Sequence, residues 1–149
     1  MGKLILFVCT GNTCRSPMAE YYFNYKSSGH KAASRGIYAE TNNLMAANAR
    51  QVLLDNNIIA SVGDISHKPA QVDTQIIGAA ELIYGITENH ANILRANYPE
   101  HAGKIRAMPE NIGDPYGAGL EVYAACFERV KSAVDIIIGE LDNLHVRNN

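Results

Sequence analysis

The sequence contains no tryptophan, no C-x-x-C motif and only three cysteines among its 149 residues. An odd number of cysteines argues against a secreted disulfide scaffold. The five histidines are dispersed along the chain and are not paired at the spacing that zinc ligands need. We therefore expect free thiols, a cytoplasmic protein, and no bound metal or other cofactor.

The sequence also lacks a long apolar segment and an excess of charge of one sign. Its first apolar run, residues 4–8, is too short for a signal-peptide core or a membrane helix. The net charge is −2, and acidic and basic residues are scattered along the chain. These features predict no membrane and no nucleic-acid partner, and any anion that the protein binds is expected to be small.

Strand-like runs alternate with helix-like segments from end to end, without a repeat, a low-complexity tract or a linker. This alternation predicts one α/β domain, residues 1–149, built on a parallel sheet. We expect the polar tail 143–149 to fray. The expected strands are 4–8, 32–36, 82–86 and 104–108.

The start of the first helix is well marked in the sequence. Ser16 is a good N-cap residue, Pro17 suits the first helical position, and Glu20 would lie in the first turn. Gly29 stands where a C-terminal stop belongs. These signals predict a helix directly after Ser16.

Three further helices are expected. One spans residues 43–55, with Leu44, Ala47 and Leu54 on its buried side. Another begins after the N-cap residue Thr87. The last helix is the clearest, because apolar residues recur at spacings of three and four. These residues are Leu120, Tyr123, Phe127, Val130, Val134, Ile137 and Leu141.

The most informative motif places Cys9 at the end of the first strand and Arg15 six residues later, at the start of a helix. Backbone N–H groups of such a loop converge on an anion, and the helix dipole adds favourable potential. Gly11 permits the unusual backbone angles that the loop needs. The motif therefore predicts a phosphate-binding loop between strand 1 and helix 1. Its expected members besides Cys9 and Arg15 are Thr10, Gly11, Asn12, Thr13, Cys14 and Ser16.

The residue types in this loop suit nucleophilic catalysis. Arg15 can offer a planar fork to two phosphate oxygens, and the loop amides favour the thiolate form of Cys9. The Ser16 hydroxyl can donate to the same sulfur. Cys9 as an ordinary core cysteine is the simpler interpretation, but a chance C-x5-R-[ST] match has a probability of only roughly 0.01 in this composition. We therefore interpret Cys9 as a nucleophile.

The segment from Cys9 to Pro17, taken together with Asp114-Pro115, resembles the low-molecular-weight protein tyrosine phosphatase family. The resemblance covers essentially the whole chain. It implies a four-stranded parallel sheet flanked by helices on both faces, no metal, and a two-step mechanism through a phosphocysteine. Phosphorylated proteins or peptides would be the substrates, and inorganic phosphate would be the product.

The leaving group needs a proton donor, and Asp114 is the candidate. It lies in the Gly- and Pro-rich loop 111–117, and the family carries its acid on such an Asp-Pro loop. Asp-Pro alone is a common turn signal, so this assignment depends on the cysteine loop. Tyr116 is expected to wall the substrate cleft.

Asn12 can adopt left-handed backbone angles and hold the loop with its side chain. The resemblance implies that Ser34 and His67 support it. Arg35 departs from the family pattern, which usually has alanine there, and His67 is also compatible with an ordinary loop histidine.

The resemblance further implies a reversible disulfide between Cys14 and Cys9, which makes the nucleophile redox-sensitive. Cys14 could alternatively be a small residue that fills space behind the loop. Cys126 lies on the apolar side of the last helix and is expected in the core.

Phosphotyrosine is the first expected substrate, and phosphoarginine is the alternative. Thr13 stands where tyrosine-specific members usually carry an aliphatic residue, and it resembles the bacterial protein arginine phosphatases; Gly117 replaces a common second tyrosine. An arsenate reductase would need two late cysteines, but only Cys126 is present. A non-catalytic phosphopeptide-binding module would not need both Cys9 and Asp114, so it ranks last.

Overall fold

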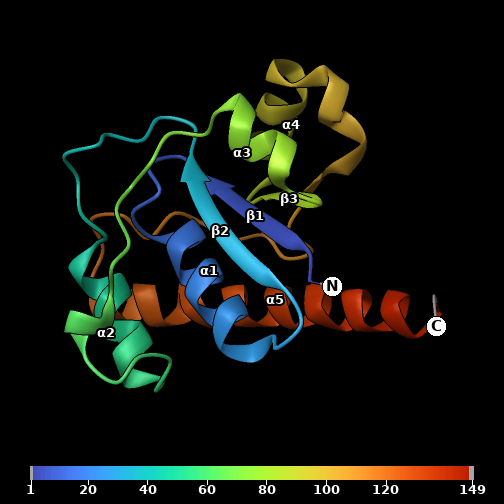
Figure 1. The fold of residues 1–149 in the computed structure, drawn as a ribbon. Coiled ribbons are helices and arrows are strands. Elements are labelled where there is room, and N and C mark those ends of the chain that lie inside the picture. Colours follow the sequence, from blue (N-terminus) through green and yellow to red (C-terminus); the bar gives the residue numbers. More distant parts are fainter. Residues whose placement is uncertain (1, 148–149) are drawn as a thin grey trace.

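The computed structural model describes residues 2–147, and their side chains up to residue 144 (Figure 1). Four parallel strands form one sheet in the order β2-β1-β3-β4. The predicted α/β fold with a four-stranded parallel sheet is confirmed, and each predicted strand agrees with the structure to within one residue at each end. The strands are β1 (Leu4–Cys9), β2 (Lys31–Gly36), β3 (Leu82–Gly85) and β4 (Ile105–Ala107).

Helices cover both faces of the sheet, as predicted (Figure 1). Helices α1 (Arg15–Lys26), α2 (Ala47–Asp55) and α5 (Leu120–Arg147) pack on one face. Helices α3 (Thr74–Ala79) and α4 (Glu88–Asn97) pack on the other. Helix α3 was not predicted from the sequence, and neither were the short 3-10 helices η1 (Val62–Asp64) and η2 (Pro99–Lys104).

Strand β1 lies inside the sheet and explains how two cores form. Ile5 and Phe7 point into the core under α1 and α5, whereas Leu6 and Val8 point into the core under α3 and α4. All four side chains are fully buried. A strand covered on both faces has no polar side, which is why its sequence is continuously apolar.

The predicted N-cap role of Ser16 is wrong. Helix α1 begins at Arg15, and Cys14 occupies the N-cap position without a side-chain capping bond. Glu20 consequently lies beyond the first turn, and the helix ends at Lys26, before Gly29. The phosphate loop runs directly into the helix, so the first-turn N–H groups are left for an anion instead of a cap.

Helix α2 begins four residues later than predicted, at Ala47. The Ala46 N–H donates to the Thr13 carbonyl (2.9 Å), which holds the preceding segment against the phosphate loop in a non-helical conformation. Leu44 is 69% exposed, so its predicted burial is wrong; Ala47 is also exposed and Leu54 is half-buried. The buried side consists of Ala49, Val52 and Leu53.

The other helix predictions agree better with the structure. Thr87 caps α4, and its side chain accepts from the His90 N–H. In the predicted stripe of α5 only Leu120 is substantially exposed (39%). Helix α5 continues to Arg147, so the expected fraying is wrong for residues 143–147. Residues 148–149 lie outside the described part of the chain. Over residues 2–147, none of the helices has the length and apolarity that a bilayer crossing requires.

Candidate active site

The loop from Cys9 to Arg15 lies at the carboxyl end of β1, in the middle of the sheet. After β1 the chain adds β2 on one side, and it later adds β3 on the other side of β1. Ligands of open parallel sheets bind outside the carboxyl ends of strands where the strand order reverses in this way. The topology therefore puts the predicted phosphate loop at the position where a site is expected.

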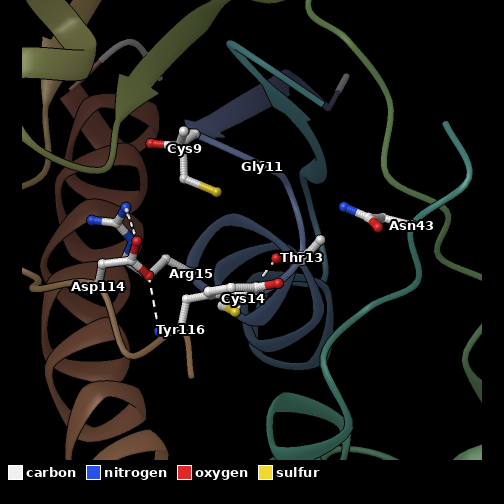
Figure 2. Close-up of a pocket in the computed structure, with 9 residues that line it drawn as sticks. Cys9, Gly11, Thr13, Cys14, Arg15, Asn43, Asp114 and Tyr116 are labelled. Carbon is white, nitrogen blue, oxygen red and sulfur yellow. Dashed lines mark hydrogen bonds and ion pairs between the residues drawn. The ribbon is translucent and has the colours of Figure 1, made fainter. Parts of the chain in front are cut away.

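A cavity of about 200 Å³ opens over this loop (Figure 2). Its walls come from the loop itself, from the segment before α2, and from the loop that precedes α5. Asn43 lies across the view in Figure 2 from Asp114 and Arg15. The lining residues are Cys9, Thr10, Gly11, Thr13, Cys14, Arg15, Asn43, Asp114 and Tyr116.

The Cys9 thiol is buried, with only 3% of the residue exposed. Its Sγ lies 2.9 Å from Ser16 Oγ. The Asn12 amide nitrogen donates to the same Ser16 oxygen at 2.8 Å, and the Ser16 hydroxyl can donate either to the sulfur or to the Arg35 carbonyl, which is 3.5 Å away. The sulfur is the nearer of these two acceptors.

Arg15 and Asp114 lie together at the cavity wall (Figure 2). One guanidinium nitrogen of Arg15, Nη1, donates to the Ile112 carbonyl at 3.0 Å, and the other, Nη2, lies 3.7 Å from Asp114 Oδ2. The Tyr116 N–H donates to Asp114 Oδ1 at 3.0 Å. The arginine side chain is buried, whereas that of Asp114 is 54% exposed to solvent.

Asn12 has a φ of 59° and is the loop residue in the left-handed region. The expectation that Gly11 supplies the unusual backbone angle is therefore wrong. The left-handed turn is held by the Asn12 side chain, whose Nδ2 donates to Ser34 Oγ (2.9 Å) and whose Oδ1 accepts from the Ala70 N–H (3.0 Å). His67 Nε2 lies 2.9 Å from the Asn12 carbonyl, which can only accept, so this nitrogen carries the proton.

Glu20 extends this network and was missed as a site residue by the sequence analysis. Ser34 Oγ donates to Glu20 Oε1 at 2.7 Å, and His67 Nδ1 lies 3.9 Å from the same oxygen. Ser34 and His67 thus both contact Asn12, as the family resemblance implies, and one carboxylate connects them. A helix glutamate has no sequence signal that distinguishes this role from an exposed one.

Cys14 is buried behind the loop, beside a residue of α5. Its Sγ lies 3.2 Å from the Tyr123 hydroxyl and 3.5 Å from Thr13 Oγ1. Burial raises the pKa of the Cys14 thiol. Cys126 lies in the core, as expected, and burial raises its pKa to about 11. The sequence assigned Tyr123 only to the apolar stripe of a helix, so its contact with Cys14 was missed.

The part of the chain that the structure describes contains no group of three or more His, Cys, Asp and Glu side chains that could hold a metal ion.

The family model of the low molecular weight phosphotyrosine protein phosphatases matches residues 4–146. The chain belongs to this family. It is therefore a hydrolase of the cysteine-dependent phosphatase class.

Similar proteins within the low molecular weight phosphatase family include two kinds of enzyme. The protein-arginine-phosphatase of Geobacillus stearothermophilus is 30% identical over 145 residues, which cover 92% of this chain and 95% of the relative. The low molecular weight protein-tyrosine-phosphatase PtpB of Staphylococcus aureus is 31% identical over 135 residues, which cover 87% and 93%.

Solved structures of the family superpose closely on this chain. The YwlE arginine phosphatase from Geobacillus stearothermophilus has a TM-score of 0.90 at 28% identity, covering 99% of this chain and 97% of the other. The low molecular weight protein tyrosine phosphatase from T. tengcongensis has a TM-score of 0.86 at 34% identity, covering 93% and 99%. The structural similarity to the family thus extends over nearly the whole chain.

Two more residues at this phosphatase site were missed by the sequence analysis. Asn43 was predicted as the first residue of a helix, but it precedes α2 and lines the cavity. His90 was not assigned any role, yet its Nε2 lies 2.9 Å from Thr10 Oγ1. Both residues come to the site from segments that are distant from the phosphate loop in sequence, and neither belongs to a local motif.

Proposed function

We propose that the chain hydrolyses phosphotyrosine in proteins or peptides through a phosphocysteine on Cys9 and releases inorganic phosphate. The observation that carries this proposal is the placement of a buried thiol against the Ser16 hydroxyl, 2.9 Å away, in a cavity that Arg15 and Asp114 also line. The nucleophile, the cation that binds the phosphate and the proton donor therefore line the same small cavity.

In the first step the Cys9 thiolate attacks phosphorus, the S–P bond forms and the P–O bond to the tyrosine breaks. Arg15 and the loop amides neutralise the charge that builds on the phosphoryl oxygens. The Asp114 carboxyl gives its proton to the departing phenolic oxygen. Its exposed position suits this role, because the leaving group departs toward solvent.

In the second step a water molecule attacks the phosphocysteine. The Asp114 carboxylate takes a proton from this water, the P–O bond forms and the S–P bond breaks. The products are inorganic phosphate and the Cys9 thiolate, which the Ser16 hydroxyl again stabilises. The chain returns to its starting state without a metal or an external reductant.

The test is rapid acid quenching of the enzyme during turnover of a phosphotyrosine peptide, followed by mass spectrometry. We expect a phosphate adduct on the peptide that contains Cys9. Release of phosphate without this adduct, and with retained activity in Cys9→Ser, would contradict the proposal.

Phosphoarginine is a second candidate substrate, and Thr13 favours it. Thr13 lines the cavity and offers a hydroxyl at a position where an aliphatic side chain would leave guanidinium donors unpaired. The similarity to the Geobacillus stearothermophilus arginine phosphatase supports this candidate. The chemistry at Cys9 would be the same, with a P–N bond broken in place of the P–O bond.

Thr13→Ile separates the two substrates. If Thr13 selects phosphoarginine, the change lowers kcat/KM on phosphoarginine peptides by roughly tenfold to a hundredfold and preserves kcat/KM on phosphotyrosine peptides. If both values fall together, Thr13 supports the loop and phosphotyrosine remains the better assignment.

We also propose a cytoplasmic location. All three cysteines are free, and free thiols are typical of the reducing cytosol. Fractionation of cells that express the chain at its natural level tests this assignment.

A further inference from the structure

One buried polar side chain, His90, reaches the phosphate loop from α4, which packs on the face of the sheet opposite to α1. His90 lies in the first turn of α4, is 5% exposed, and has its Nε2 2.9 Å from Thr10 Oγ1. Thr10 directly follows Cys9, is exposed, and lines the cavity. The contact therefore connects a helix of the second core to the reacting centre.

The surroundings of the His90 ring determine which nitrogen carries its proton. The Thr87 backbone N–H, which can only donate, lies 3.2 Å from Nδ1. Thr87 Oγ1 lies 2.8 Å from the same nitrogen and accepts from the His90 N–H, so its own proton can also point to Nδ1. Nδ1 must therefore present a lone pair, and the proton of the neutral ring is on Nε2. It follows that Nε2 donates and that Thr10 Oγ1 accepts.

The same surroundings keep the ring neutral. Burial, and then the positive charge of Arg15, lower the pKa of His90 to about 4, while Asp114 acts in the opposite direction. The N-terminus of α4 adds further positive potential that disfavours an imidazolium. At neutral pH the ring is thus a single donor in a single tautomer.

This arrangement has a consequence for the Thr10 hydroxyl. Its oxygen accepts from His90, so its own proton must point elsewhere. Among the residues that the structure describes, the hydroxyl has no other hydrogen-bond partner, and the cavity lies beside it. We propose that His90 is a positioning residue that turns the Thr10 hydroxyl proton toward the phosphoryl oxygens of a bound phosphate group. This inference rests on the proposed phosphatase function.

The first test uses p-nitrophenyl phosphate turnover and calorimetric binding of inorganic phosphate to the full chain. Thr10→Val removes the hydroxyl at constant shape and should lower kcat/KM and phosphate affinity by roughly tenfold to a hundredfold, the usual range for a hydrogen bond to a charged group. Thr10→Ser should restore most of the loss. Full affinity and kcat/KM in Thr10→Val would overturn the proposal.

His90 is tested through its dependence on Thr10. His90→Leu should lower the same two quantities, His90→Gln, which keeps a donor, should recover part of the loss, and His101→Leu is the matched control. If His90 acts through Thr10, the double variant His90→Leu/Thr10→Val is no worse than Thr10→Val. Losses that multiply would show that His90 acts independently of the hydroxyl, and would refute the proposal.

A spectroscopic measurement on the unmodified chain completes the test, and it does not depend on variants that fold. Imidazole ¹⁵N shifts of His90 should show a proton on Nε2 and no titration between pH 5 and pH 8. A proton on Nδ1, or titration near the ordinary histidine range, would overturn the inference. Phosphate binding and these shifts stay measurable if the chain fails to hydrolyse any phosphate ester, so failure of the proposed function is distinguishable.

Discussion

The loop from Cys9 to Arg15 and the loop that carries Asp114 line the same cavity, but the protein holds them differently. Asn12 and Ser16 are fully buried, and each makes side-chain hydrogen bonds within the site. In the other loop Asp114 has a side chain that is 54% exposed, and Tyr116 is 71% exposed.

This difference fits the two tasks that we propose for these loops. An anion-binding loop is effective when its hydrogen-bond donors are already oriented toward the negative charge that develops, so these donors must be held rigidly. A proton donor must instead meet leaving groups that enter and depart, so it belongs on an exposed loop. We expect changes in the first loop to affect every substrate, and changes in the second to depend on the leaving group.

The largest effect is expected from Cys9→Ser. Turnover of any phosphate ester should fall by roughly 10⁴-fold or more, because the phosphocysteine cannot form. Phosphate should still bind, because the loop amides and Arg15 remain. Steady-state kinetics and calorimetric phosphate titration measure the two quantities, and loss of both together would argue that Cys9 is needed for the shape of the loop.

Asp114→Asn should have the next largest effect, and it separates the two loops. On a phosphotyrosine peptide kcat should fall by roughly 10²- to 10⁴-fold, the usual contribution of general acid–base catalysis. An activated aryl phosphate, whose leaving group needs less protonation, should lose less. The matched control is Asp73→Asn, in the N-cap of α3. An equal loss on both substrates would mean that Asp114 acts through the turn.

A smaller, reversible effect is expected from mild peroxide. Cys9 should be oxidised first and then joined by Cys14, so that a dithiol restores activity. Because the buried Cys14 thiol has a raised pKa and contacts Tyr123, it serves as the resolving group and is not the first target. Cys14→Ser should recover much less activity after the same treatment, because Cys9 then has no resolving thiol. Mass spectrometry checks the bond, and sulfinic acid on Cys9 beside a free Cys14 would contradict this protection.

The smallest effect concerns stability. The pKa of His90 is lowered from 6.5 to about 4, mainly by burial, so between these values the unfolded chain binds a proton that the folded chain does not. The unfolding free energy should therefore fall as pH drops from 6.5 to 4, by at most about 1.4 kcal/mol per pH unit from this group. His90→Gln should remove that slope in urea titrations, and His101→Gln should keep it. An unchanged slope in His90→Gln would show that His90 is not buried in neutral form.

Much of the fold could be predicted because its signals are local. The apolar run of β1 and the spacing along α5 mark elements whose faces are buried whatever surrounds them. The motif from Cys9 to Arg15 is equally local, since a strand, a tight loop and a helix are consecutive in the chain. Errors occurred where a distant contact decided the local structure. The start of α2, delayed by the bond from Ala46 to Thr13, is one example.

The sequence by itself therefore determined the strand–loop–helix unit, the position of Cys9 at its turn, and the family to which the chain belongs. The tertiary structure decided how that unit is supported, because Ser34, His67 and His90 contact it only after separate segments pack. One close approach shows the physical reason: a Cβ built on Gly85 would lie 2.9 Å from the Ala91 Cα, so the missing side chain lets α4 lie against β3. That packing brings the adjacent His90 to Thr10, and no local pattern of residues encodes such a meeting.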